Sequence, residues 1–115
     1  MIKKAEEMVK EIKEKMRGGK GSVELVHIFS QNEFKGKIRL CAKITIEPGS
    51  SIGFHQHADE EEMFYIIKGK GTFNDNGNIK ELECGDSVLT GNGASHSVEN
   101  TGEEDLEMLA VILLY

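Results

Sequence analysis

Two histidines and a run of acidic residues mark the stretch of this sequence that is best suited to chemistry. His55 and His57 lie two positions apart, directly before four consecutive acids at positions 59–62. Side chains alternate between the two faces of a β-strand, so residues two apart project from the same face. Neutral imidazole is a common ligand of first-row metal ions. The pair is therefore suited to chelating one ion.

One carboxylate of the acidic run can join the two histidines if the chain turns back on itself. Glu62 follows His57 by five positions, so on one continuous strand its side chain would point to the opposite face. A four-residue hairpin loop over 58–61 would make His57 and Glu62 cross-strand neighbours on one face. This interpretation leaves the other three acids of the run in a solvated turn: Asp59, Glu60 and Glu61.

A third histidine completes a plausible ligand set. His96 lies in "GNGASHSVEN", near the start of another short run with strand character. Three imidazoles and one carboxylate form a site for a divalent first-row metal ion, with open positions if the ion is five- or six-coordinate. The ligand types alone do not choose among Mn, Fe, Co, Ni, Cu and Zn. His27 shares its parity with Val23 and Leu25, which indicates a half-buried, hydrogen-bonded histidine rather than a further ligand.

Short β-strands are the elements that must position these residues. After Ser22 the sequence consists of brief runs rich in Val, Ile, Leu, Phe and Thr, separated by turn signals such as Asn76-Gly77. Residues 38–46 alternate clearly between apolar and polar side chains. Strands at this spacing without helices between them predict an antiparallel sandwich or barrel.

The N-terminal residues have a different pattern. Apolar side chains recur at the spacing of one helical stripe: Ile2, Ala5, Met8, Val9, Ile12 and Met16. This spacing predicts an amphipathic α-helix over residues 1–17, ended by the glycine-rich stretch 17–22. We therefore expect a helix and connector over residues 1–21 and a single β-domain over residues 22–115.

The final run, 108–115, is apolar on both faces, so it needs cover from another layer, the helix or a second subunit. This pattern favours a homodimer.

Composition excludes several classes of partner. The chain has 38% hydrophobic and 30% charged residues and a formal net charge of -6. This acidic balance argues against binding to nucleic acid or to an anionic membrane. The two cysteines form no CxxC pair, which argues against a disulfide framework. No N-terminal segment resembles a signal peptide, so we expect a cytoplasmic protein.

Two motifs in this sequence resemble those of the cupins. The first cupin motif is a glycine, five residues, His-x-His, three or four residues, a glutamate, six residues and a glycine. It fits Gly49, His55, His57, Glu62 and Gly69, and the last gap selects Glu62 over Glu61. The second motif fits Gly85, Gly93, His96 and Asn100, although Gly91 stands where the family usually has proline.

This resemblance implies an all-β fold, an antiparallel jelly-roll barrel of the germin, oxalate-decarboxylase-like or RmlC-like kind. It also implies a divalent metal inside the barrel, bound by His55, His57, Glu62 and His96. Phe64 and Ile66 share the parity of Glu62 and are expected in the core and cavity wall, where they would contact a substrate. Arg39 is either a solvated cation on the outer face of its strand or a partner for an anionic substrate.

Three functions are compatible with this reading. The first is a metal-dependent enzyme that acts on a small carboxylate, diol or enol by oxidation, decarboxylation or isomerisation. The second is a non-catalytic module that binds a metal and a small ligand. The third is sugar isomerisation or epimerisation, which in metal-free barrels uses histidine as a base and is disfavoured by the intact ligand set. The sequence identifies no proton-transfer residue.

Overall fold

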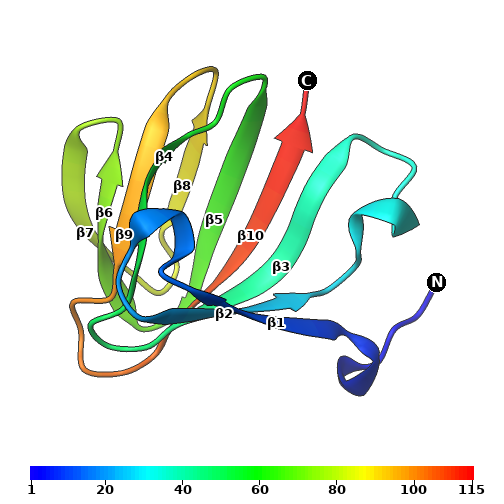
Figure 1. Ribbon diagram of the computed structural model, residues 1–115, viewed down its shortest axis with the longest axis horizontal. Coiled ribbons are helices and arrows are strands. Elements are labelled where there is room, and N and C mark those ends of the chain that lie inside the picture. Colours follow the sequence, from blue (N-terminus) through cyan, green and yellow to red (C-terminus); the bar gives the residue numbers. More distant parts are fainter.

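Two antiparallel β-sheets face each other in the computed structural model, which describes all 115 residues (Figure 1). The larger sheet has six strands in the order β1-β2-β3-β10-β5-β8, and the smaller has four in the order β4-β9-β6-β7. The strands are β1 (Val9–Glu14), β2 (Ser22–His27), β3 (Ile38–Ile46), β4 (Ser51–Gln56), β5 (Glu60–Lys68), β6 (Lys70–Asp75), β7 (Asn78–Glu83), β8 (Ser87–Gly91), β9 (Ser95–Glu99) and β10 (Leu106–Leu114). The predicted all-β fold is confirmed.

The helices are three single 3-10 turns, η1 (Ala5–Glu7), η2 (Met16–Gly18) and η3 (Gln31–Glu33). No helix has the length and the apolar character that crossing a membrane requires.

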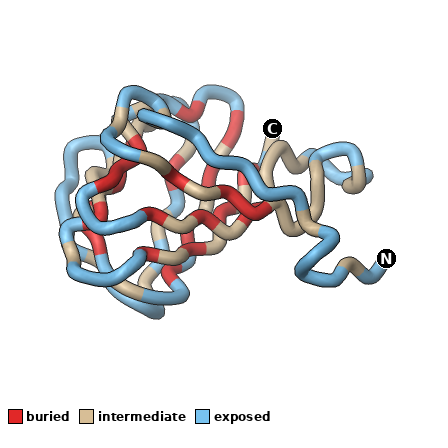
Figure 2. Tube along the Cα trace, turned by 60° about the horizontal axis from the view of Figure 1, so that its bottom comes forward, coloured by how far each residue is buried: buried red, intermediate tan, exposed pale blue.

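The hydrophobic core fills the space between the sheets, as the alternating sequence pattern predicts. Ala42, Ile44 and Ile46 on β3 are buried, whereas the residues between them are only partly covered. Strand β10 supplies Leu106, Met108 and Ala110 from the centre of the larger sheet. Figure 2 shows the buried segments gathered in the middle of the molecule and the exposed N-terminal segment at one side. Burial of one face thus fixes the register of the strands that enclose the core.

The predicted N-terminal helix is wrong. Residues 9–14 form strand β1, which pairs along its whole length with β2, from Val9 opposite His27 to Glu14 opposite Ser22. A helical stripe is stabilised only where it lies on an apolar surface, and of the stripe residues Met16 alone packs against the core. Pairing with the edge of β2 satisfies the backbone of both strands instead. Tertiary pairing therefore overrides the local helical spacing.

The predicted hairpin over residues 58–61 is also wrong. Strand β4 belongs to the four-stranded sheet and β5 to the six-stranded sheet, so the chain crosses between the sheets at this point. His57 and Glu62 consequently face each other across the interior rather than along one sheet. By contrast, the Asn76-Gly77 hairpin is confirmed: both residues have positive φ, and they join β6 to β7.

A β-bulge in β4 turns the histidine pair inward. Ile52 pairs with Val98 and His55 with His96, so two residues of β4, Gly53 and Phe54, oppose one residue of β9. Ile52 is buried, and without the bulge alternation would carry the core face on to position 54. Phe54 is instead 55% exposed, and His55 joins the interior face. The bulge therefore reverses the parity of the strand just before its two histidines.

Gly53 holds this bulge against the turn η2. A Cβ atom built on Gly53 would lie 2.1 Å from the carbonyl oxygen of Arg17, and one on Gly19 would lie 2.2 Å from that of Ser51. No side chain larger than hydrogen fits at either position without displacement of the backbone. The two glycines thus let η2 and the bulged strand approach directly.

We predict that Gly53→Ala destabilises the fold by about 1 to 3 kcal/mol, since the added methyl group overpacks a backbone contact. Urea unfolding of this variant measures the effect. Gly36→Ala is the matched control, because a Cβ atom at Gly36 meets no atom within 4 Å. Equal stability of the two variants would contradict the role assigned to the contact.

Candidate metal centre

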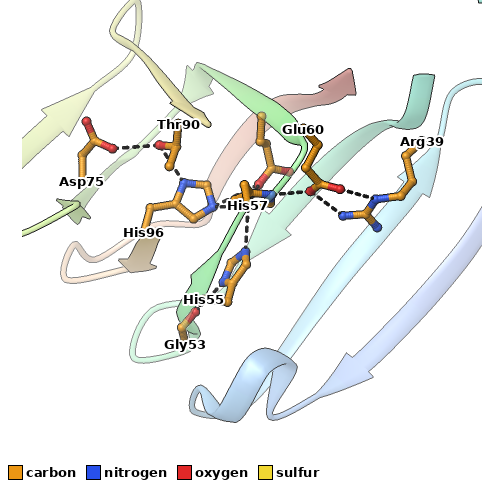
Figure 3. Close-up of polar contacts among 9 residues, drawn as sticks. Arg39, Gly53, His55, His57, Glu60, Asp75, Thr90 and His96 are labelled. Carbon is orange, nitrogen blue, oxygen red and sulfur yellow. Dashed lines mark hydrogen bonds and ion pairs between the residues drawn. The ribbon is translucent and has the colours of Figure 1, made fainter. Parts of the chain in front are cut away.

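Three histidines, labelled in Figure 3, meet Glu62 between the two sheets. The Nε2 atom of His57 lies 3.1 Å from Nε2 of His55 and 3.0 Å from Nε2 of His96. The Oε1 atom of Glu62 lies 3.1 Å from Nε2 of His57 and 3.0 Å from Nε2 of His96. The four potential donor atoms all lie within 4.8 Å of one another. The structure thus brings together every residue that the sequence predicted as a ligand.

Both sheets contribute to this cluster. His55 on β4 and His96 on β9 are directly paired across the smaller sheet. His57 follows β4, and its backbone bonds to the loop before β9 through His57 N to Ala94 O and Gly93 N to His57 O, each 2.9 Å. Glu62 projects from β5 in the larger sheet. The cluster therefore depends on the packing of one sheet against the other.

Each histidine is oriented by a hydrogen bond at its second ring nitrogen. Nδ1 of His55 donates to the carbonyl oxygen of Gly53 at 2.7 Å, since a carbonyl can only accept. Nδ1 of His57 donates to the carboxylate of Glu60 at 2.5 Å. These contacts place the proton on Nδ1 and leave Nε2 with its lone pair.

The third histidine is oriented through a longer chain. Nδ1 of His96 lies 3.1 Å from the hydroxyl of Thr90, and that hydroxyl donates to Asp75 at 2.8 Å. Because the hydroxyl proton is used on Asp75, the Thr90 oxygen accepts the Nδ1 proton of His96. The ring is also stacked on Phe64, with centroids 5.0 Å apart and planes 10° apart.

The donor set fits a divalent metal ion. Three Nε2 lone pairs and one carboxylate oxygen point toward one small region, and His57, Glu62 and His96 are buried. Lone pairs this close repel one another unless positive charge lies among them. One proton can relieve the repulsion between only two of these atoms, whereas a metal ion among them relieves the repulsion between all four. Oriented imidazoles with Nδ1 partners are the arrangement that metal-ligating histidines adopt.

Burial and hydrogen bonding shift the pKa values of three groups in the cluster. Burial lowers the pKa of His55 and so favours the neutral ring. The hydrogen bond with Glu62 raises the pKa of His57. Burial opposes ionisation of Glu62, but the hydrogen bonds with His57 and His96 outweigh it and lower the pKa of this carboxyl. The shifts of His57 and Glu62 thus favour positive charge beside the carboxylate, whereas the shift of His55 favours a neutral ring.

Glu60 is a functional residue that the sequence analysis misplaced. It lies at the start of β5 and is buried, not in a solvated turn. Its carboxylate accepts two hydrogen bonds from Arg39, at 3.0 Å from Nε and 2.8 Å from Nη2, in addition to the bond from His57. The hydrogen bonds from Arg39, and to a smaller extent the bond from His57, lower the pKa of Glu60 to about 2. Glu60 is therefore an ionised partner for His57.

Arg39 reaches Glu60 because β3 contains a bulge. Leu40 pairs with Ile112 of β10 and Ile38 with Leu113, which leaves Arg39 as the extra residue. Strand alternation alone therefore does not describe its direction. Arg39 is neither a free cation on the outer face nor fully inside the barrel: its side chain is 38% exposed and lines the cavity that leads to the cluster.

A cavity of about 640 Å³ connects this cluster to solvent. Part of its wall is apolar and consists of Leu25, Leu40, Ile44, Ile52, Phe64 and Ile112. Charged residues of β1 and η2 also line it, together with Arg39 and His27. His27 is half-buried and bonded to Glu11 at 2.9 Å, as the sequence analysis expected. Of the two residues expected on this wall, Phe64 lies there, whereas Ile66 lies in the closed core.

We predict that Glu60→Ala raises the metal dissociation constant by about tenfold to a hundredfold, because the His57 ring loses the partner that fixes its tautomer and orientation. Competition with a fluorescent chelator measures the affinity. Glu61→Ala, one position along the strand, is the control and should retain the affinity of the unchanged protein. An unaltered affinity in Glu60→Ala, with both variants folded by circular dichroism, would show that this carboxylate does not support the site.

Comparison with known proteins connects this site to a family. The cupin domain family matches residues 42–112. An oxalate-binding protein of Thermotoga maritima is 46% identical over 114 residues, which cover 99% of this chain and 94% of that protein. The crystal structure of a predicted oxalate decarboxylase from Thermotoga maritima matches with a TM-score of 0.94 at 46% identity over 100% of both chains.

A more distant structure agrees in fold alone. A cupin domain from Schizosaccharomyces pombe has a TM-score of 0.74 at 11% identity, over 91% of this chain and 69% of that one. The predicted cupin-type architecture is therefore confirmed at both high and low sequence identity.

Proposed function

Because this chain belongs to the cupin family, we propose that it is a metal-dependent enzyme acting on a small carboxylate. One divalent first-row transition-metal ion would be held by four side chains: His55, His57, Glu62 and His96. The observation that carries the proposal is the convergence of four donor atoms within 4.8 Å, with a hydrogen-bond partner behind each imidazole. When bound, the ion would supply Lewis acidity or, if iron or manganese, a redox centre for oxidation or decarboxylation.

The surrounding residues have separate tasks in this proposal. Glu60 and Thr90 hold the rings of His57 and His96 in the orientation that presents Nε2 to the ion. Phe64 restricts the His96 ring from its face and contributes apolar surface to the cavity. The apolar wall limits competing water and strengthens electrostatic attraction near the ion. Arg39 keeps Glu60 ionised and lends positive charge to the approach.

Charge at the cavity rim supports an anionic substrate. Lys15 and Arg17 line the same cavity as Arg39, and neither is in any of the ion pairs of the structure. Two carboxylates also line it, but Glu11 is bonded to His27 and Glu14 to Ser22. The names of the Thermotoga maritima relatives, an oxalate-binding protein and a predicted oxalate decarboxylase, support the same class of ligand. A carboxylate could chelate the ion at positions that the protein leaves open.

A non-catalytic binding module is the second candidate. The relative's name refers to binding of oxalate rather than to its conversion, and this observation favours the alternative. The two candidates share the metal and the ligand and differ only in whether product forms.

Two free cysteines, Cys41 and Cys84, support our further proposal of a cytoplasmic location.

We predict that the purified protein, after saturation with each of Mn, Fe, Co, Ni, Cu and Zn and then gel filtration, retains one ion per chain for at least one metal. His57→Ala should lose that ion, because it removes the imidazole in contact with all three other ligands. His27→Ala is the matched control, since His27 lies outside the cluster. Elemental analysis measures the content. No retained ion in any case, with no effect of His57→Ala, would refute the metal proposal.

We predict that oxalate binds the metal-loaded protein and not the metal-free protein. Calorimetric titration at low salt should give a dissociation constant about tenfold higher in the double variant Lys15→Gln, Arg17→Gln, because two cations leave the rim, and added salt should reduce this difference. Lys80→Gln on β7 is the control for loss of a cation elsewhere. Release of carbon dioxide, formate or hydrogen peroxide from the same samples distinguishes an enzyme from a binding module. Oxalate binding without metal would contradict the proposed mode.

A further inference from the structure

Strand β1 leaves one edge of the six-stranded sheet open. It is the terminal strand of that sheet, and all six of its residues are exposed. Val9 is 56% and Ile12 58% exposed, although both are apolar. An open edge of this kind presents unpaired N–H and C=O groups that another strand can bind.

The hydrogen bonds of β1 to β2 show which backbone groups face this open edge. The N–H of Lys15 donates to the carbonyl of Gly21, which continues the β1–β2 register beyond Glu14 and Ser22. In an antiparallel pair, residues alternate between facing the partner strand and facing away. Odd-numbered residues of β1 therefore bond to β2. The even-numbered residues, Lys10, Ile12 and Glu14, direct their N–H and C=O groups outward.

We propose that a second copy of this chain pairs with this edge through its own β1, about a twofold axis at Ile12. Antiparallel pairing about this axis places Ile12 opposite Ile12 of the partner subunit and Lys10 opposite Glu14 of the partner subunit. On the other face, Glu11 lies opposite Lys13 of the partner subunit. Every charged side chain between positions 10 and 14 thus meets the opposite charge, and the only apolar one meets its own copy.

No other twofold register of this strand has this property. An axis one residue away puts Glu11 or Lys13 opposite its own copy, and an axis two residues away does so for Lys10 or Glu14. Like charges directly opposite each other are destabilising. An axis between two residues would pair outward-facing backbone groups with inward-facing ones, so it would form no ladder. The sequence "VKEIKE" is therefore self-complementary in one register.

This pairing would join the two six-stranded sheets into one continuous sheet. It would also support the outer wall of each cavity, because Glu11 and Lys13 of β1 line it. The inference rests on the edge strand alone and holds whether or not the site binds metal. It gives the homodimer that the apolar β10 suggested a defined interface, at the edge of the sheet instead of on its outer face.

Disulfide crosslinking tests the register. In a chain whose own cysteines are replaced by Cys41→Ala and Cys84→Ser, Ile12→Cys should form a symmetric crosslinked dimer on mild oxidation. Directly opposed residues in such a ladder have Cα atoms about 5.5 Å apart, within the range of a disulfide. Lys10→Cys should not crosslink to itself, because its copy lies four residues along the strand, but it should crosslink when mixed with Glu14→Cys.

Charge reversal tests the energetics without cysteines. Lys10→Glu places like charges at two symmetry-related pairs, so the dimer dissociation constant from analytical ultracentrifugation should rise about tenfold or more. Adding Glu14→Lys to the same chain should restore the original affinity, since the pairs are then exchanged rather than lost. Lys80→Glu on the other sheet controls for the change in net charge.

Three outcomes would overturn the proposal. The chain could remain a monomer at all accessible concentrations. A dimer could form with an affinity that Lys10→Glu does not alter, for example through the outer face of β10. Crosslinking of Lys10→Cys to itself would show edge pairing in a different register. Protection of the Glu11 and Lys13 amides from hydrogen exchange in each variant shows that β1 still pairs with β2, so a loss of dimer is not mistaken for a loss of this strand.

Discussion

The bulge at Gly53 and Phe54 is the constraint on which the candidate metal centre depends. Strand β4 must present Ile52 to the core and, three residues later, His55 to the same interior. Regular alternation cannot satisfy both, because three is an odd number. One extra residue reverses the parity, and the carbonyl that the bulge frees at Gly53 accepts the Nδ1 proton of His55. The same irregularity thus directs the ring inward and fixes its tautomer.

A second bulge has a comparable effect on the opposite sheet. The extra residue at Arg39 lets its guanidinium reach Glu60, which in turn holds His57. The two bulges, one in each sheet, therefore orient two neighbouring ligands, His55 and His57. Both lie in strands whose remaining residues alternate regularly, so the core can be closely packed while the site departs from the pattern. These two irregularities lie at residues that orient the cluster, whereas a third register shift, between Glu107 and Met108 of β10, involves none of them.

The sequence predicted the sheet class, the alternation of β3, the hairpin at Asn76-Gly77 and the four clustered side chains. These features depend on local spacing, or on motifs whose spacing reflects the fold. It did not predict the strand at 9–14, because helical spacing and strand pairing compete there and only the free edge of β2 decides between them. The sequence analysis also placed Glu60 in a solvated turn. A hairpin within one sheet and a crossover between two sheets can have the same short connecting sequence, so residues 58–61 did not distinguish them. The sequence analysis did not decide between two roles for Arg39, because the apolar–polar alternation of residues 38–46 gives no indication of the bulge.

The glycine at position 91 illustrates how packing can explain a departure from a family pattern. A Cβ atom there would lie 2.4 Å from Cβ of Glu61 and 2.8 Å from the carbonyl oxygen of Glu60. Strands β5 and β8 can therefore pair closely at the point where Glu60 must remain beside His57. A proline ring in this backbone position would push against β5, so the loss of the usual proline is compatible with an intact ligand set.

The lining of the cavity combines ligand residues, apolar side chains and cations. Lys15 and Arg17 are exposed, whereas Arg39 is bonded to Glu60 beside the ligand His57. An anion that enters the cavity loses water, and in the proposed function a metal ion held by the cluster would offset this cost. The exposed cations would then attract many anions, and the ion would select those that can coordinate it. Residues of β1 and η2 line the same cavity, so part of its wall comes from N-terminal residues that lie outside the matched region 42–112.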